Sequence, residues 1–395
     1  MSEVANIPQL RFPGFSDEWE ERPLKDVSTF FNGKAYKQAE LLSSGKYPVL
    51  RVGNFFTNNS WYYSNLELDE NKYCDNGDLL YAWSASFGPR IWAGEKVIYH
   101  YHIWKVINHS QVTKKFLFIV LDNETAKMKA QSANGFALLH ITKGTIENWK
   151  INLPTRQEQQ KIAAFLAAVD SKIEQLSKKQ ALLGEYKKGL MQQIFTQEIR
   201  FKAGDGSDFP DWEEKKLGDV FEIKAGQSKS KHIKKDGKNI IVDMGGISSE
   251  PKLVAKKLTD YDDDFLTTND LVMPKDDIGG GLIIGKVAEI PENNKYICGD
   301  HIYKLTVVNG NITFLKYAIN SYQVNKSFRQ KANGTAQIGL SRKEVENQLL
   351  SFPSLKEQTK IANFLSSIDS KIEQVGKQLN ESKQFKKALL QQMFV

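Results

Sequence analysis

The sequence predicts two α/β (α+β) globular bodies and two long α-helices that pair as an antiparallel two-helix coiled coil, with a pseudo-two-fold relation between the halves. A repeat and a heptad pattern predict this fold. Segment 153–195 recurs at 352–394 with a constant offset of 199, and 21 of the 43 aligned positions are identical. Both copies carry apolar residues at helical heptad spacing. The chain is therefore expected to be a tandem duplication of a body followed by a helical tail.

The front of the unit also repeats, at a different offset. Residues 18–21 (Glu-Trp-Glu-Glu) match residues 211–214 (Asp-Trp-Glu-Glu) at an offset of 193, so insertions lie inside the bodies. The expected boundaries are 1–152 for the first body, 153–199 for the first helix, 200–351 for the second body and 352–395 for the second helix.

Each body mixes short β-like runs with shorter helical patterns. Strand-like runs occur at 47–52, 78–81, 240–242 and 270–273, and helical patterns at 114–122 and 314–321. These patterns predict an α/β or α+β body but no strand order.

The two tails are expected to pack against each other through one apolar stripe each. A helix of about 40 residues is about 60 Å long, which is too long for a small globular core. The expected contact residues are Ile162, Leu166, Val169, Ile173 and Leu176 in the first helix, Ile361, Leu365, Ile368, Ile372 and Val375 in the second, with Tyr186 and Phe385 continuing the stripes. The alternative is that each stripe packs only on its own body.

Connectivity predicts the direction of the helix pair. Only residues 196–212 separate the first tail from the second body's opening motif, so the second body begins near the far end of the first helix. The second tail must then run back, which makes the pair antiparallel, with the bodies at opposite ends and the chain termini close together.

Charge, cysteine content and the lack of long apolar runs limit the classes of protein to which this chain could belong. There are 54 basic and 47 acidic residues, a net charge of +7 that favours a polyanionic partner but also suits an ordinary enzyme. Two cysteines, Cys74 and Cys298, argue against a disulfide framework and for a reducing compartment. No apolar run approaches the length of a membrane span, and residues 1–14 hold no signal core. We expect a cytoplasmic protein with no membrane partner.

Two pairs of loops are candidate contact surfaces. The lysine-rich stretch 224–238 and its thinner counterpart 33–37 suit phosphate contacts, although a solvated loop is the alternative. Stretches 83–90 and 275–281 occupy matching positions but differ almost completely, as different binding specificities would require. The candidate residues are Lys34, Tyr36, Lys37, Trp83, Ser84, Ser86 and Arg90 in the first body, and Lys229, Lys231, Lys234, Lys235, Lys275 and Gly280 in the second.

Catalytic motifs are not complete anywhere in the sequence. The run 280–287 approaches a phosphate-binding loop but ends in Val287, which has no hydroxyl for magnesium. The nuclease-like stretch 210–215 belongs to the repeated scaffold, and no two prolines are consecutive, as an adenine methyltransferase loop would require. His100 and His102 could bind a metal, but burial or hydrogen bonding is the favoured use. We expect no catalytic residue, metal or cofactor on this chain.

The motif P-x-x-x-E-Q-x-x-I-A-x-F-L stands at 154–166 and again at 353–365. With the stretches 11–15 and 77–84, it resembles the specificity subunit of bacterial Type I restriction-modification systems over the whole length. The second body departs at 269–272, where Asn-Asp-Leu-Val replaces the Gly-Asp-Leu-Leu of residues 77–80.

The resemblance implies a DNA sequence-recognition role. Each body would be a target recognition domain for one half of a split, asymmetric site in double-stranded DNA, and the helices a spacer. The partners would be two modification (methyltransferase) subunits and two restriction (ATP-dependent translocase and nuclease) subunits, and S-adenosylmethionine, ATP and Mg²⁺ would be bound by these partners. Outward positions around 157–161 and 358–360 are candidate partner contacts.

Two other functions stay open at this point. One is a stand-alone DNA methyltransferase or nuclease with two recognition domains. The other is a scaffold whose helices recruit proteins and whose bodies bind something other than duplex DNA.

Overall fold

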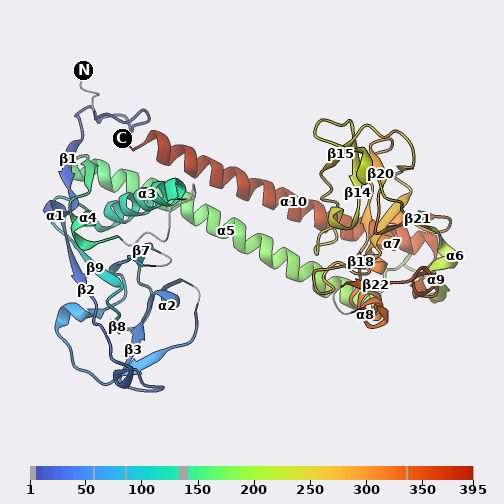
Figure 1. The fold of residues 1–395 in the computed structure, drawn as a ribbon, viewed down its shortest axis with the longest axis horizontal. Coiled ribbons are helices and arrows are strands. Elements are labelled where there is room, and N and C mark those ends of the chain that lie inside the picture. Colours follow the sequence, from blue (N-terminus) through green and yellow to red (C-terminus); the bar gives the residue numbers. More distant parts are fainter. Residues whose placement is uncertain (1–5, 57, 85–86, 133–140, 335–336, 395) are drawn as a thin grey trace. The chain divides into compact units, whose positions relative to one another are not determined.

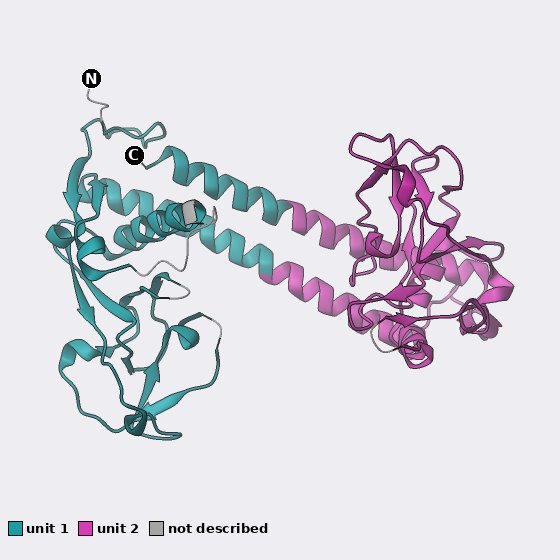
Figure 2. Ribbon diagram, in the orientation of Figure 1, with its two compact units in different colours: residues 1–177, 378–395 teal, residues 178–377 magenta. Residues whose placement is uncertain are grey.

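The computed structural model describes residues 6–394 except 57, 85–86, 133–140 and 335–336. The chain divides into two compact units, unit 1 (Met1–Ser177 and Gln378–Val395) and unit 2 (Lys178–Lys377), which Figure 2 colours separately. Two long helices, α5 (Arg156–Phe195) and α10 (Leu355–Gln392), are shared between the units, so that each unit contains a part of both (Figure 1). The rest of each unit consists of mixed sheets and shorter helices. The mixed α/β (α+β) fold class with long helices is therefore confirmed.

Unit 1 contains two four-stranded sheets and one two-stranded sheet, in the orders β2-β9-β6-β7, β4-β3-β8-β5 and β1-β10. The strands are β1 (Glu20–Pro23), β2 (Ser28–Asn32), β3 (Tyr47–Leu50), β4 (Tyr62–Ser64), β5 (Tyr73–Cys74), β6 (Leu79–Ala82), β7 (Gly88–Ile91), β8 (Val97–Tyr99), β9 (Ile103–Asn108) and β10 (Lys150–Leu153). The helices before α5 are α1 (Leu24–Val27), α2 (Val52–Phe56), α3 (Lys114–Ser132) and α4 (Lys143–Glu147), with short 3-10 turns at Gln38–Glu40 and Glu70–Lys72.

Unit 2 contains sheets in the orders β12-β21-β17-β19, β13-β15-β14-β20-β16, β11-β23 and β18-β22. The strands are β11 (Glu213–Lys216), β12 (Phe221–Ala225), β13 (Ile233–Lys234), β14 (Asn239–Val242), β15 (Lys257–Thr259), β16 (Phe265–Leu266), β17 (Asp270–Pro274), β18 (Asp276–Asp277), β19 (Ala288–Glu289), β20 (Tyr296–Cys298), β21 (Ile302–Val307), β22 (Ile338–Gly339) and β23 (Leu349–Phe352). The helices before α10 are α6 (Leu217–Val220), α7 (Ile312–Ile319), α8 (Tyr322–Lys331) and α9 (Arg342–Glu346), with 3-10 turns at Ser230–His232 and Met244–Gly246.

The two units repeat the same central sheet. In unit 1, β9 pairs antiparallel with both β2 and β6, and in unit 2 β21 pairs in the same way with β12 and β17. Helices α4 and α9 begin with equivalent caps, because the Thr142 and Ser341 side chains each accept from the backbone N–H three residues on. The sequence repeat is thus a repeat of supersecondary structure.

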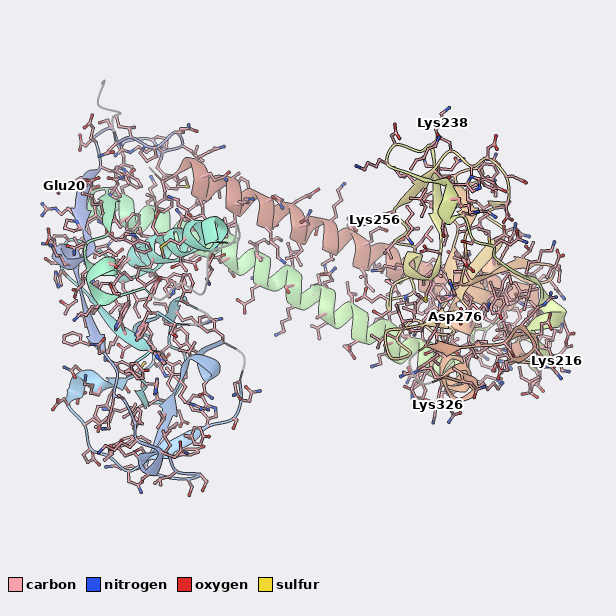
Figure 3. All side chains as sticks on the ribbon, in the orientation of Figure 1. Glu20, Lys216, Lys238, Lys256, Asp276 and Lys326 are labelled. Carbon is pink, nitrogen blue, oxygen red and sulfur yellow. The ribbon has the colours of Figure 1, made fainter. Side chains whose placement is uncertain are left out.

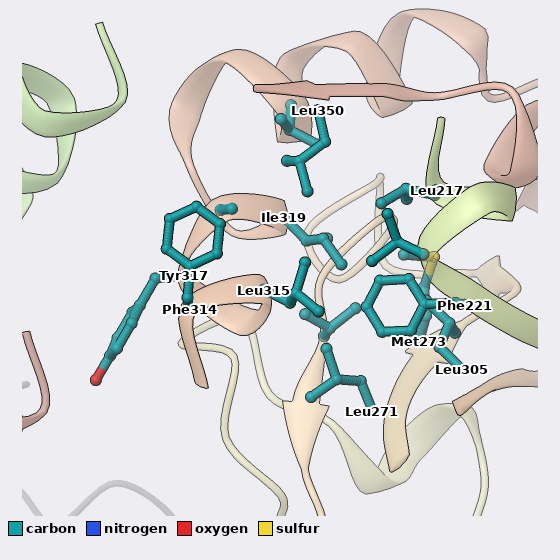
Figure 4. Close-up of a cluster of buried hydrophobic side chains, with 14 of the residues drawn as sticks. Leu217, Phe221, Leu271, Met273, Leu305, Phe314, Leu315, Tyr317, Ile319 and Leu350 are labelled. Carbon is teal, nitrogen blue, oxygen red and sulfur yellow. The ribbon is translucent and has the colours of Figure 1, made fainter. Parts of the chain in front are cut away.

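Each core forms where the central sheet meets the helices. In unit 2 a buried cluster joins Leu271, Met273 and Leu305 of the sheet to Phe314 and Leu315 of α7 (Figure 4). Alternation along β12 supplies part of it, since Phe221 and Ile223 are buried while Glu222 and Lys224 are exposed. Unit 1 has the equivalent cluster between its central sheet and α3.

The long helices pack antiparallel within each unit. The first turns of α5 (Ile162, Leu166) share a core with the end of α10 (Leu389) in unit 1, and the end of α5 (Ile194) shares one with the start of α10 (Ile361) in unit 2. Among the predicted contact residues, Ile162, Leu166, Leu176, Ile361, Leu365, Ile368 and Val375 are buried, and Val169, Ile173 and Ile372 are half-buried. In unit 1 residues near the two ends of the chain also meet, because the Leu10 N–H donates to the Gln392 carbonyl at 2.9 Å.

The prediction that Tyr186 and Phe385 face the partner helix was wrong. Both rings are more than half exposed. The inward positions belong to the following residues, Lys187 and Lys386, whose ammonium groups pair at 2.6 Å with Asp369 and Asp170 of the facing helix. A lysine can lay its aliphatic stem along an apolar seam and still pair its charge. These two equivalent ion pairs lie in the seam where the aromatic rings were expected.

No helix among the described residues is long and apolar enough to span a bilayer.

Candidate nucleic-acid interface

Three loops of unit 1 meet at one edge of the central sheet. They follow β2, follow β6 and precede β9, and antiparallel pairing brings these strand ends together. The Gly33 N–H donates to the Ile103 carbonyl at 3.1 Å, and the Trp83 N–H donates to the His102 carbonyl at 3.1 Å. A Cβ at Gly33 would lie 2.3 Å from the His100 carbonyl oxygen, so only glycine fits where the loop after β2 passes the backbone of His100.

This edge gathers aromatic and imidazole rings. Tyr36 stacks on His100 with centroids 6.2 Å apart, and Trp83 meets His102 edge to face at 4.8 Å. Trp83 also stacks on the buried Trp104, and its indole N–H donates to the Tyr101 carbonyl at 2.8 Å. Two loops that the sequence singled out separately are therefore brought together, with the Trp83 ring held in one orientation.

The polar groups at this edge are mostly neutral or paired. Burial, together with the smaller effects of His102 and Arg51, lowers the pKa of His100 to about 4, so this ring is neutral near pH 7. Burial raises the pKa of Tyr36, whose hydroxyl finds no hydrogen-bond partner among the described residues. Lys34 lies 3.4 Å from Glu40, while Lys37 is exposed.

Two further candidates of unit 1, Ser84 and Arg90, lie in the loop after β6 and in β7. Ser84 is buried, and Arg90 is exposed with its guanidinium 4.9 Å from the Phe56 ring centroid. Arg90 also lines a cavity of about 480 Å³ together with Phe87 and Lys129. Ser86 lies outside the described residues.

Unit 2 has the equivalent edge of its central sheet, with different side chains. The Gly226 N–H donates to Ile302 at 2.9 Å, as Gly33 does to Ile103. The Lys275 N–H donates to the His301 carbonyl at 2.8 Å, as Trp83 does to His102. Lys275 thus stands where unit 1 has Trp83, on an equivalent backbone.

The loop after Lys275 is held by a buried carboxylate. Asp277 is 2% exposed and accepts hydrogen bonds from the backbone N–H groups of Gly279 (2.5 Å) and Ile283 (2.7 Å). Gly280, at φ +77°, is exposed between them. Asp276, labelled in Figure 3, accepts from His301 Nδ1 at 2.7 Å. The sequence did not single out His301.

The lysine-rich loop presents fewer free charges than its sequence suggests. Lys229 is 7% exposed and pairs with Asp264 at 3.2 Å while lying over the Tyr261 ring, so we remove it from the candidate phosphate contacts. Lys234 pairs with Asp260 at 2.6 Å. Lys231 and Lys235 are exposed, and within the described part of the chain neither makes an ion pair.

The repeated E-Q motif has an internal role that the sequence did not reveal. Glu158 is fully buried and receives two hydrogen bonds from Arg11, at 2.7 and 2.8 Å, and Glu357 receives the equivalent pair from Arg200. Gln159 and Gln358 are also buried; each donates to the carbonyl of the proline five residues before it. These four motif residues therefore anchor the helix starts to the bodies and are not available to a partner subunit. The outward positions 157, 160, 161, 359 and 360 are exposed, and their role as partner contacts stays a prediction.

The edge residues are suited to stacking and hydrogen bonding. Among the described residues, no group of three or more His, Cys, Asp or Glu side chains is arranged to hold a metal ion. Both thiols are free and buried, and burial raises the pKa of Cys298 to about 12, which keeps this thiol protonated. Stacking rings, exposed lysines and polar loop tips are the groups that contact nucleic acids.

Comparison with known proteins agrees with this chemistry. The family model described as the Type I restriction modification DNA specificity domain matches residues 16–183 and again 210–383. The chain is 27% identical to the Type I restriction enzyme MjaVIII specificity subunit of Methanocaldococcus jannaschii, over 96% of this chain and 92% of that one. It is 20% identical to the EcoBI specificity subunit of Escherichia coli, over 93% and 82%.

A similar fold has been solved by crystallography. The S subunit of a Type I restriction-modification system from M. genitalium superimposes with a TM-score of 0.63 at 15% identity, covering 98% of this chain and 99% of that one. The family model covers more than half of the chain, once in each repeat. The chain therefore belongs to the Type I restriction-modification DNA specificity family.

Proposed function

We propose that each unit reads one half of a bipartite, asymmetric target in double-stranded DNA, and that the long helices set the length of the unread spacer. The observation that carries this proposal is the pair of equivalent sheet edges with different side chains, Trp83 in unit 1 and Lys275 in unit 2. Equivalent backbones can approach DNA in the same way, whereas different side chains select different bases. The two half-sites should then differ in sequence.

The chemistry of methylation and cleavage would belong to partner subunits. We propose assembly with two modification subunits, which bind S-adenosylmethionine and flip an adenine out of each half-site, and with two restriction subunits that use ATP and Mg²⁺. This chain would bind none of these cofactors and would act with its partners in the cytoplasm. The relatives are named as specificity subunits, so a stand-alone methyltransferase or nuclease is not favoured.

Exposed aromatic rings on the long helices are our candidates for docking the modification subunits. Tyr186 is 57% exposed and Phe385 is 53% exposed, and the two positions are related by the repeat offset of 199. Aromatic side chains are enriched in protein interfaces and among the residues that contribute most of the binding energy. Two repeat-related rings would suit two copies of one partner.

The docking surface can be tested by single substitutions. Tyr186→Ala and Phe385→Ala should each weaken assembly with the modification subunit in analytical ultracentrifugation, without changing the unfolding midpoint. Tyr322→Ala is the matched control, because Tyr322 is 68% exposed on the short helix α8. Equal assembly by all three variants would exclude these rings as the docking site.

Exchange of one body tests the half-site assignment. Residues 28–150 would be replaced by the corresponding segment of another family member, and the methylated sites mapped in a host that also supplies the modification subunits. One half of the target should change and the other should stay the same. A change in both halves would contradict independent reading by the two units.

A further inference from the structure

We propose that Asp300 and His301, oriented by Asp276, read a G·C base pair in the half-site recognised by unit 2. The imidazole would donate to guanine and the Asp300 carboxylate would accept from cytosine. This inference rests on the proposed function and names one base pair and the two side chains that select it.

The three side chains form one fixed cluster. His301 Nδ1 lies 2.7 Å from Asp276 Oδ2, and Nε2 lies 3.6 Å from Asp300 Oδ2. The Asp300 carboxylate is itself held, because its Oδ1 accepts from the His301 backbone N–H at 2.8 Å. Asp276 is 14% exposed, whereas His301 and Asp300 are 45% and 44% exposed. Asp276 therefore positions the ring, and the other two groups face solvent side by side.

The backbone also marks this position. His301 has φ +58°, in the left-handed region that non-glycine residues seldom adopt. Such a conformation costs free energy and is concentrated at functional sites. The His301 carbonyl accepts from Lys275 N–H at 2.8 Å, which ties the strained residue to the loop that replaces the Trp83 loop of unit 1.

Unit 1 has a histidine at the equivalent position with a different neighbour. His102 matches His301 at the repeat offset of 199, but it packs against Trp83 with ring centroids 4.8 Å apart. The equivalent histidines thus present an aromatic contact in one unit and a hydrogen-bonding pair in the other. This is the kind of difference that two distinct half-sites require.

The spacing of the cluster fits one base pair. In a G·C pair, guanine O6 and cytosine N4 are hydrogen-bond partners about 2.9 Å apart on the major-groove edge. The donor, His301 Nε2, and the acceptor, Asp300 Oδ2, are 3.6 Å apart, close enough for each to contact one base of the same pair. In this arrangement Nε2–H donates to O6 or N7 and Asp300 accepts from the N4 amino group.

An A·T pair fits the same cluster poorly. Donation to thymine O4 would place the ring against the thymine methyl group, and the carboxylate that accepts from adenine N6 would lie beside the N7 acceptor. A metal site is not supported either, since the two carboxylates face different ring nitrogens and do not converge.

The test uses the full chain assembled with its modification subunits and duplexes that carry the mapped target. Each base pair of both half-sites is replaced in turn, and binding is measured for the native chain, Asp300→Asn and His301→Gln. The native chain should prefer G·C at one position of the unit 2 half-site. Both variants should lose at least about fivefold of that preference, with the other half-site and the salt slope unchanged.

Two matched controls distinguish base reading from a general loss of DNA binding. Asp262→Asn, at an exposed aspartate of unit 2, should leave all base preferences unchanged, and N4-methylcytosine at the chosen position should weaken binding by the native chain but not by Asp300→Asn. Unchanged preference in both cluster variants, or a uniform loss with a smaller salt slope, would overturn the G·C reading while leaving the proposed function intact. A native complex that recognises no bipartite duplex would overturn the proposed function and the G·C reading with it.

Discussion

Removing the Arg11 guanidinium should destabilise unit 1, because Glu158 would keep its buried charge without its partner. The two hydrogen bonds measure 2.7 and 2.8 Å, and the side chains of Arg11 and Glu158 are 10% and 0% exposed. Breaking a fully buried ion pair from one side costs about 3–5 kcal/mol. Since Arg11 keeps some contact with water, we expect Arg11→Ala to lower the free energy of unfolding by about 2 kcal/mol.

This loss can be measured by urea unfolding. With a slope of about 2 kcal/mol per molar urea, the midpoint of unit 1 should fall by about 1 M. Hydrogen exchange of peptides from unit 1 should report the transition, because a chain of two units need not unfold in one step.

Two variants of the same region control the measurement. Arg22→Ala removes an exposed arginine that pairs with exposed Glu20, and it should leave the midpoint unchanged. The double variant Arg11→Met/Glu158→Met should recover most of the loss, because apolar side chains can replace a buried ion pair. A midpoint for Arg11→Ala equal to that of Arg22→Ala would refute the anchoring role of the motif.

Three further predictions concern the interface and the helices. The double variant Lys231→Ala/Lys235→Ala should weaken DNA binding for all sequences and reduce the slope of log K against log salt by about 1.8, measured by titration at several salt concentrations. Lys229→Ala should instead lower the stability of unit 2, because Lys229 is paired with Asp264. Gly226→Ala should destabilise unit 2 by about 1–3 kcal/mol in urea unfolding, because the new Cβ would lie 1.9 Å from the Gly299 carbonyl oxygen. Gly204→Ala is the control and should leave the stability unchanged, because Gly204 has open space around it. Inserting four residues at matched positions of α5 and α10 should lengthen the DNA spacer by one or two base pairs in site mapping, since four helical residues add about 6 Å; an unchanged spacer would contradict the ruler role.

The sequence repeat predicted the architecture well because it compares the chain with itself. A constant offset identified both long helices, and strand pairs such as β2-β9 and β12-β21 fall at the offsets read from the sequence. The equivalence of Trp83 and Lys275 followed from the same alignment, and identical backbone hydrogen bonds support it.

Side-chain roles were harder to predict, because they depend on partners far away in the chain. The heptad pattern placed Tyr186 and Phe385 in the seam, yet Lys187 and Lys386 occupy it because facing aspartates pair with them. Lys229 looked like a surface charge until Asp264 was found beside it. The residues next to these lysines in the sequence do not indicate that a distant aspartate pairs with them.

The buried role of the E-Q motif could not be predicted from the sequence for the same reason. The arginines that pair with its two buried glutamates, Arg11 and Arg200, lie 147 and 157 positions earlier in the chain. Similarly, His301 becomes a candidate only when Asp276 and Asp300 are seen on its two ring nitrogens.

Mapping of methylated adenines across the genome of a host that expresses this chain with its modification subunits tests the central claim most directly. The two units predict one recurring target made of two different half-sites, separated by a fixed number of unread base pairs. A palindromic target, a continuous target, or half-sites at variable separation would contradict recognition by two different units on a helical spacer.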